Sequence, residues 1–482
     1  MVETKKENIL SKVIVGSLSL VFFGCAILYV LYPFPLFMII NGALLLSFTF
    51  IFQGRYRIYA YAFYLPMAKF MIIQNADLGS FFTWNIIIYS FVVFIEMLLK
   101  RETLSSHNKA IIIFLTIFAL YMLVVNLINI GTTSFYQYFS AMAYLFLLIA
   151  LVLDKKGEKN KKTLIISFAL GVLLSNIIPA VFIYFIKSQA IPFLSTYIPN
   201  YVSSYQANNA AAFRFPGLLG DPNHNACCIL LVSTLLVMIM PRNNKTIVIV
   251  ILLFLQLFAL LGASKTYFFG LAIIVIMLLI LRFYKTKYFL IVLMIFIGVA
   301  LFAFVILLNT SLGTVFKRII IIDNRVGFLD AITTHRTTIY SSYLISMLSD
   351  PIRFLIGHGI NASNYPINMD AHNTLIEMIW HFGMIGSIFY CAFFYNFFKF
   401  NFTKIPRVYL LPIIVILTFS LALHLAYKEY IYMGIFIYYT FLSQHKVEMT
   451  DGIQERNNTK IDNCKDKRTE IARRKNKYEI HI

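Results

Sequence analysis

Long, nearly uninterrupted apolar stretches dominate the chain and determine its predicted architecture. A helix rises 1.5 Å per residue and the hydrocarbon core of a bilayer is about 30 Å thick, so a spanning helix needs about 20 mostly apolar residues. Fourteen such stretches occur, several of them short, and the 246–281 and 408–443 regions can each form a hairpin or one long element. We therefore predict an all-α polytopic integral membrane protein with 12 to 14 transmembrane helices. The stretches are 12–32, 34–53, 58–73, 81–99, 110–130, 135–153, 163–186, 225–240, 246–262, 266–281, 288–308, 374–398, 408–425 and 430–443.

The composition supports the membrane assignment. Apolar residues make up 60% of the 482 residues and charged residues only 13%, whereas soluble domains carry about 25% charge. A soluble globular enzyme is therefore excluded, and five cysteines are too few to staple a chain of this size. The segment Tyr32-Pro33-Phe34-Pro35 leads from the first stretch directly into the second without a small-residue cleavage site, so we expect the first helix to be retained.

The net charge of +20 follows the predicted topology and does not require a nucleic-acid partner. With the N-terminus placed inside, 21 of the 41 Lys and Arg residues fall in inside loops, 10 in the tail after residue 443 and 9 outside. This is the positive-inside asymmetry that orients membrane proteins. We therefore predict that both termini are cytoplasmic and that the basic tail, 444–482, is disordered.

Two loops are much longer than the others, and both are predicted to be extracytoplasmic. They divide the chain into helices 1–186, a first external loop 187–224, helices 225–308, a second external loop 309–373, helices 374–443 and the tail. Long loops on a rigid scaffold commonly carry function. We therefore expect the chemistry to lie on the outer side of the membrane.

The second loop is predicted to contain an interfacial helix. Thr333 or Thr334 can cap its start, and Asp350-Pro351 is expected to stop it. One face of this helix is apolar at helical spacing, which is typical of a helix lying along a membrane surface. The apolar positions are Ile339, Tyr340, Tyr343, Leu344, Met347 and Leu348.

Three cations in or beside these loops are candidate anion-binding groups. Arg214 precedes a compact Gly- and Pro-rich segment that leads into a span, and a helix start with an arginine suits phosphate oxygens. Arg336 stands near the start of the predicted interfacial helix, and Lys265 lies at the outer end of a tight hairpin. The alternatives are a snorkelling side chain for Arg214 and Lys265 and a headgroup contact for Arg336.

His372 is the candidate general base. It lies at the external mouth of the span that begins near 374, where a neutral imidazole can accept a proton from a sugar hydroxyl. An ordinary interface histidine is the alternative. The external histidines lack the spacing of zinc ligands, so no metal site is predicted from them. They are His224, His335, His358 and His372.

Taken in order, these motifs resemble the O-antigen ligase and polymerase superfamily of bacterial envelope polysaccharide assembly. The resemblance covers about residues 205–390. The matching positions are Arg214, Gly217, Pro222 and Asn223, the pair Ser264-Lys265, Arg336, the turn Gly357-x-Gly359, the run His372-Asn373-x-Leu375, and Gly383 with Gly386.

The resemblance implies a function on the outer face of the bacterial cytoplasmic membrane, where members of this family transfer glycans from undecaprenyl diphosphate without a metal or cofactor. It implies that Arg214 and Arg336 bind the diphosphate, that Asn223 and Asn373 contribute to substrate binding, and that His372 is the general base. Lys265 stands where many relatives have an arginine, and a lysine cannot make the same bidentate contact. The implied partners are lipid-linked donor and acceptor glycans, membrane lipids, and the flippase and chain-length regulator of the same pathway.

The function within this family is left open by the sequence. A polymerase joins lipid-linked repeat units into capsular, exopolysaccharide or O-antigen chains, whereas a ligase transfers the finished chain to lipid A-core. Richness in Ile, Lys and Asn is typical of an AT-rich genome, and in a Gram-positive host there is no lipopolysaccharide to receive the chain, so we favour the polymerase. A flippase or other transporter is a further alternative, although few charges (Lys69, Glu96) lie in the spans and no internal repeat is found. No feature favours a purely structural scaffold.

Overall fold

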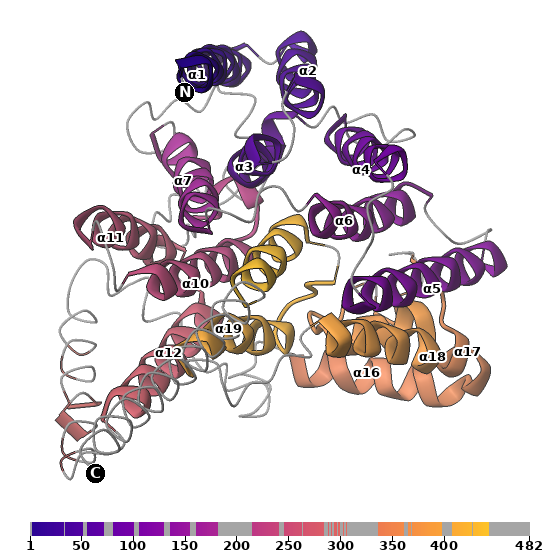
Figure 1. Cartoon of the computed structure of the whole chain (residues 1–482). Helices are drawn as coiled ribbons and strands as arrows, with labels where there is room; N and C mark the ends of the chain where they lie inside the picture. Colours follow the sequence, from indigo (N-terminus) through magenta and orange to yellow (C-terminus); the bar gives the residue numbers. More distant parts are fainter. Residues whose placement is uncertain are drawn as a thin grey trace, which may run out of the picture.

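A computed structural model of the whole chain shows an assembly of helices (Figure 1). The structure describes residues 2–32, 34–51, 55–71, 81–100, 106–129, 135–154, 161–181, 215–240, 245–262, 264–283, 336–360, 365–367, 369–397, 407–426 and 428–442, together with isolated residues between 288 and 305. The predicted tail 444–482, most of the predicted span 288–308, and Arg214 lie outside the described residues.

All regular secondary structure among the described residues is helical, as predicted. The helices are α1 (Val2–Leu31), α2 (Pro35–Ile51), α3 (Arg55–Tyr64), α4 (Phe81–Leu99), α5 (Ser106–Ile128), α6 (Phe135–Leu153), α7 (Lys161–Ala180), α10 (Pro222–Ile239), α11 (Lys245–Leu261), α12 (Lys265–Phe283), α16 (Arg336–Ser349), α17 (Pro351–Ile356), α18 (Thr374–Phe397) and α19 (Leu411–Ser420). A further helix spans 429–442, and 3₁₀ turns cover Leu65–Met71, Gly217–Leu219 and Arg407–Leu410.

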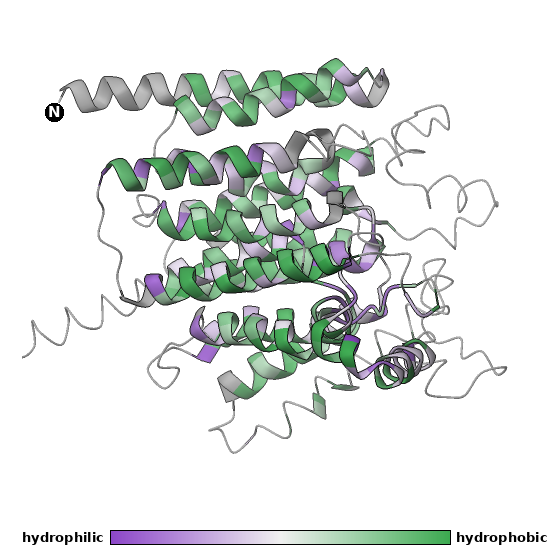
Figure 2. Cartoon of the chain, turned by 90° about the vertical axis from the view of Figure 1, so that its right-hand side faces the viewer, coloured by the Kyte–Doolittle hydropathy of each residue, from purple (hydrophilic) through white to green (hydrophobic). Residues whose placement is uncertain are grey.

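Four helices in the described part of the chain are long and apolar enough to cross a membrane. They are Lys109–Ile128, Lys161–Ala180, Pro222–Ile239 and Thr374–Asn396. Shorter apolar helices accompany them, and Figure 2 shows hydrophobic residues along most of the helices. Large apolar side chains such as Leu99, Ile128 and Leu253 are exposed on their outer faces. Extensive exposed apolar surface is rare in soluble monomers, so these helices are compatible with a membrane protein.

The helix α10 lies at the centre of one half of the assembly. Helices α7, α11, α12 and α19 all pack against it (Figure 1), and nearly every side chain from Asn225 to Ile239 is buried. Its start is well defined, because the Asp221 side chain accepts hydrogen bonds from the backbone N–H groups of Asn223 and His224. Such an N-cap, followed by proline at the first helical position, is a strong start signal. The helix begins at Pro222, three residues before the predicted span.

A buried ion network joins α3, α4 and α6. Arg57 lies 3.0 Å from Glu96 and 2.9 Å from Asp154, and its side chain is fully buried. This places one of the two charges predicted within the spans, Glu96, in an ion pair. A buried arginine that contacts two carboxylates stabilises the local packing only while all partners are present.

The helix α18 is broken at Gly383, although the sequence predicts one continuous span over 374–398. Gly383 has φ +64° and ψ −175°, which is not helical. The break lets the chain after α17 approach closely, so that the backbone N–H groups of His358 and Gly359 donate to the carbonyls of Trp380 and His381, at 2.9 Å each. The predicted Gly-x-Gly turn therefore packs directly on the break in α18.

The helix α16 lies across one end of the assembly, where it is seen end-on in Figure 2 while most other helices run across the view. The N-terminus lies at the opposite end (Figure 2). The predicted helix is present, and Asp350-Pro351 does end it, but Asp350 then caps α17 by accepting from the backbone N–H of Arg353. Thr333 and Thr334, the predicted caps, lie outside the described residues.

Only part of the predicted apolar face of α16 is buried. Ile339, Tyr343 and Met347 pack with Ala371 and Trp380 in a small cluster. Leu344 and Leu348, which were predicted on the same face, are 51% and 72% exposed. The predicted apolar face is therefore divided between a buried stripe that packs on the protein and an exposed stripe.

The close approach at Gly383 makes a specific stability prediction. A Cβ atom at residue 383 would lie 2.1 Å from the carbonyl oxygen of Leu355, and the backbone is in the left-handed region. We expect Gly383→Ala to lower the free energy of unfolding by about 2–5 kcal/mol. Thermal unfolding in detergent measures this. The control is Gly24→Ala, because nothing lies within 4 Å of a Cβ added at Gly24; equal melting temperatures for the two variants would contradict the account.

Candidate functional site

Polar side chains from three segments gather beside the start of α18. The segments are the described residues of the loop 365–373 (365–367 and 369–373), the first turns of α18, and the described, non-helical residues of the 421–428 stretch (421–426 and 428) that follows α19. The sequence predicts a span over 408–425, but α19 ends at Ser420. The backbone carbonyls that follow Ser420 accept hydrogen bonds from side chains. For example, Thr374 Oγ1 donates to the Leu423 carbonyl at 2.7 Å. These contacts fix the start of α18 against the 421–428 stretch.

His372, the predicted general base, lies within hydrogen-bond distance of Asp370. Its Nδ1 atom lies 2.9 Å from Asp370 Oδ1, and the two side chains are 39% and 40% exposed. His372 has φ +49°, the one positive value among the described residues other than glycine. A histidine whose backbone lies in the left-handed region costs conformational energy, and such residues occur more often at functional sites. The Asp370 carboxylate contacts the Nδ1 side of the imidazole, so Nε2 is the ring nitrogen that does not face Asp370.

Asn373 caps α18. Its Oδ1 atom accepts from the backbone N–H groups of Leu375 and Ile376, at 3.0 and 3.1 Å. Its Nδ2 atom donates to the Leu421 carbonyl at 3.3 Å, and the residue is 8% exposed. In this geometry Asn373 orients the residue before it, His372, and its predicted contact with substrate stays a prediction.

Arg336 opens α16 on the same side of the assembly. One turn later, Tyr340 donates its hydroxyl to the Leu421 carbonyl at 2.8 Å, the same carbonyl that Asn373 contacts. Four residues of helix cover about 6 Å. The structure therefore brings the start of α16 to the same corner as His372.

The predicted residue Asn223 contacts Ser264, which directly precedes the predicted residue Lys265 in the chain. The Ser264 hydroxyl donates to Asn223 Oδ1 at 2.7 Å, and Lys265 is the first residue of α12. The neighbouring His224 hydrogen-bonds the Tyr430 hydroxyl through Nδ1, at 2.9 Å. His224 is also an electrostatic neighbour of His372 and Lys428, so the segment that begins α10 faces the His372 corner.

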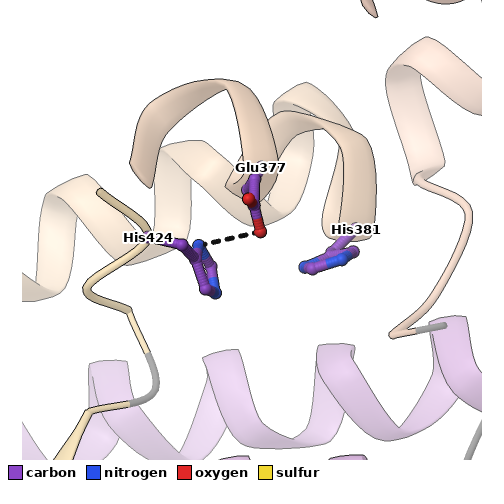
Figure 3. Close-up of side chains that lie close together, drawn as sticks. All are labelled: Glu377, His381 and His424. Atoms are coloured by element: carbon purple, nitrogen blue, oxygen red, sulfur yellow. Dashed lines mark ion pairs between the residues drawn. The ribbon is translucent and has the colours of Figure 1, made fainter. Parts of the chain in front are cut away.

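A cluster of two histidines and one glutamate lies close to this corner and is not predicted by the sequence pattern. Glu377 Oε2 lies 3.1 Å from His424 Nδ1, and Figure 3 shows Glu377 pointing between His424 and His381. Glu377 and His381 are 0% and 2% exposed. One atom of each residue lies within 4.8 Å of the others, an arrangement able to hold a metal ion.

Two of the three residues of this cluster could have been grouped from the sequence. Glu377 and His381 are four residues apart and therefore share one face of α18. His424 comes from a distant segment that was assigned to a span, so its approach follows only from the tertiary structure. Asp370 and Lys428 were likewise not assigned a role. The histidines considered as metal ligands from the sequence, such as His224 and His358, are a different set.

The deeper His358 is a packing residue. Its ring stacks on Trp380 with centroids 3.8 Å apart. Burial lowers the pKa of His358 to about 4, and the nearby charge of Arg353 acts in the same direction. The folded protein therefore keeps this imidazole neutral at the pH values where most proteins work.

The His358 environment predicts a pH dependence of stability. An unfolded histidine binds a proton below about pH 6.5, whereas folded His358 does so only near 4. The stability that the neutral ring contributes is present above pH 6.5 and is lost as the pH falls toward 4. Melting temperatures of the wild type should therefore fall more steeply from pH 7 to pH 5 than those of His358→Gln. Parallel slopes for the two proteins would show that His358 is not held neutral.

No protein-family model, curated protein or solved structure matches this chain. The function proposed below therefore rests on the resemblance carried by the sequence motifs and on the geometry of the chain's own residues.

Proposed function

We propose that this chain is a membrane glycosyltransferase that polymerises undecaprenyl-diphosphate-linked oligosaccharide units on the outer face of the bacterial cytoplasmic membrane. The observation that carries the proposal is the Asp370–His372 pair. A partly exposed imidazole oriented by a carboxylate is the arrangement that general-base catalysis requires. The backbone of His372 has a positive φ, a conformation that is unusual for a residue other than glycine. Such a conformation favours a functional role over a packing role.

The proposed reaction is one displacement at the anomeric carbon of the donor. His372 Nε2 accepts the proton of the acceptor hydroxyl while the hydroxyl oxygen forms a bond to the anomeric carbon. The bond between that carbon and the diphosphate oxygen breaks, and undecaprenyl diphosphate leaves with the electron pair. Asp370 stabilises the imidazolium that forms, and the proton then passes to solvent.

The diphosphate is the part of the substrate that needs cations. Charge develops on its oxygens as the glycosidic bond breaks, and positioned donors stabilise that charge. Arg336, Lys265 and Arg214 are proposed for this role, with Arg336 supported by the contact of its helix with the His372 corner. Lys428, an electrostatic neighbour of His224 and Glu377, is a further cation at the same corner. Lysines here act as point charges rather than as bidentate ligands.

The proposed membrane arrangement has 12 to 14 spanning helices, with both termini cytoplasmic and the site on the outer side. The opposite positions of the N-terminus and α16 support this arrangement (Figure 2). The exposed apolar stripe of α16, which includes Leu344 and Leu348, suits a helix at the membrane surface. A lipid-linked substrate could then reach His372 without leaving the bilayer.

A transporter of lipid-linked glycans is the second candidate. The broken helix α18, with buried Glu377 and His381 before the break, is a feature that transporters also use. A ligase would use the same Asp370–His372 pair and the same cations. It would differ from a polymerase only in the acceptor that receives the glycan. The experiments below separate the three.

Removing the proposed base should abolish chain growth. In a strain that lacks the protein, we expect complementation with His372→Ala to give at least about 100-fold less polymer than complementation with the wild type. Asp370→Asn should also lower polymer formation. Surface-glycan gels measure this as loss of the ladder with single units retained. His107→Ala, in the first turn of α5 at the end predicted to be cytoplasmic, is the matched control. A normal ladder with His372→Ala would contradict the proposal, and a ladder retained on the lipid carrier but not transferred would indicate a ligase.

Arg336 tests the anion-binding part of the proposal. We expect Arg336→Ala to lower the rate of polymerisation about 10- to 1000-fold and Arg336→Lys to restore only part of it, because the lysine keeps the charge but not the bidentate geometry. Radiolabelled repeat units followed in membrane vesicles give the rate. The conservative exchange Thr337→Ser, at the next position of α16, is the control. Full activity of Arg336→Ala would remove this residue from the site.

A further inference from the structure

The cluster of Glu377, His381 and His424 is built from two parts of the chain that are otherwise held together by hydrogen bonds. Glu377 and His381 share one face of α18, and His424 belongs to the stretch after α19 (Figure 3). The three candidate ligand atoms all lie within 4.8 Å of one another. In a tetrahedral zinc site, nitrogen and oxygen ligands lie about 3.4 Å apart. A bound ion would have to draw the more distant of these atoms closer together to reach that spacing.

The chemistry of the cluster favours a cation. Glu377 is fully buried, and burying a carboxylate among apolar side chains is costly unless positive charge or several hydrogen bonds offset it. Two imidazole nitrogens with one carboxylate oxygen form a donor set that zinc uses in proteins, with a fourth position left for water. Hard ions such as Mg²⁺ and Ca²⁺ prefer all-oxygen sites. The donor set therefore selects a transition metal.

The residues around the cluster hold it in the way that metal ligands are held. The Tyr365 hydroxyl lies 3.4 Å from Nε2 of His381, so Nδ1 is the nitrogen that a metal ion would use. The nearby backbone amides of Ala371 and His372 favour the charged form of the Glu377 carboxylate, and neither carboxylate oxygen has a hydrogen-bond partner of normal geometry among the described residues. Metal-binding histidines commonly hydrogen-bond through their second ring nitrogen, and metal-binding carboxylates are also oriented by neighbours.

We propose that Glu377, His381 and His424 bind one divalent transition-metal ion, with Zn²⁺ as the expected occupant. The ion would join the first turns of α18 to the 421–428 stretch and so hold the base of the corner that carries His372. This inference goes beyond the proposed glycosyl transfer and does not rest on it, because metal content is measured without any assay of activity. The ion is assigned no step in the transfer reaction.

The test is the metal content of the full-length protein in detergent, purified through a tag without histidines. After incubation with Zn²⁺ and removal of free metal, mass spectrometry should give about one zinc per wild-type chain. His381→Ala and His424→Ala should each retain at least about fivefold less. His358→Gln, which changes a neighbouring histidine outside the cluster, is the matched control and should retain the wild-type amount. Zinc that is retained equally by all four proteins would overturn the assignment of the site.

A second measurement uses only the wild-type chain, so it remains valid if a variant fails to fold. Replacing Zn²⁺ with Co²⁺ should give the visible absorption of a four-coordinate site, and a chelator should remove that absorption and lower the melting temperature. Parallel incubations with Mn²⁺ and Fe²⁺ identify a different preferred ion. A wild-type protein that retains less than about one ion per five chains with every metal, and shows no cobalt spectrum, would overturn the proposal and leave a close Glu–His contact without a metal.

Discussion

The close contact between the Gly357–Gly359 turn and the broken part of α18 is the constraint on which the site depends. An unbroken helix would use the carbonyls of Trp380 and His381 internally, but the break at Gly383 presents them to the N–H groups of His358 and Gly359. No side chain fits at Gly357 either, because an added Cβ would lie 2.3 Å from the His381 carbonyl oxygen. This contact fixes the first half of α18 separately from the second half, and that half carries Glu377 and His381.

The site follows from where polar groups can be satisfied in a largely apolar chain. The end of α19 at Ser420 leaves the carbonyls of Leu421 and Leu423 to accept bonds from Tyr340, Asn373 and Thr374. These bonds draw α16 and the start of α18 to one corner. Backbone groups that would be costly to bury unpaired thereby position the Asp370–His372 pair at its exposed side and the Glu377 cluster at its buried side.

Long apolar stretches predicted most of the described helices, because an apolar stretch of about 20 residues is a strong local signal. The span predicted over 58–73 is an exception, since α3 ends at Tyr64 and a kinked 3₁₀ segment follows it. The sequence pattern also identified the helix beginning near Arg336 and the glycine motifs that meet at the break in α18. It did not show the break itself, because apolar residues continue through Gly383 on both sides. His424 was missed for a related reason, since the apolar run of α19 hides the irregular stretch that follows. The Asp370–His372 pair was predicted only in part. His372 was identified from its residue type and its position before a span, whereas its positive φ depends on how the loop packs.

The most direct test of the central claim uses the purified protein in liposomes with one synthetic polyprenyl-diphosphate-linked repeat unit, supplied on the accessible face. A transferase in which His372 is the base should form a lipid-linked dimer of the repeat unit and release polyprenyl diphosphate in equal amounts, and His372→Ala liposomes should form neither. Movement of the intact substrate across the bilayer, without dimer and without released diphosphate, would contradict the account and identify a transporter.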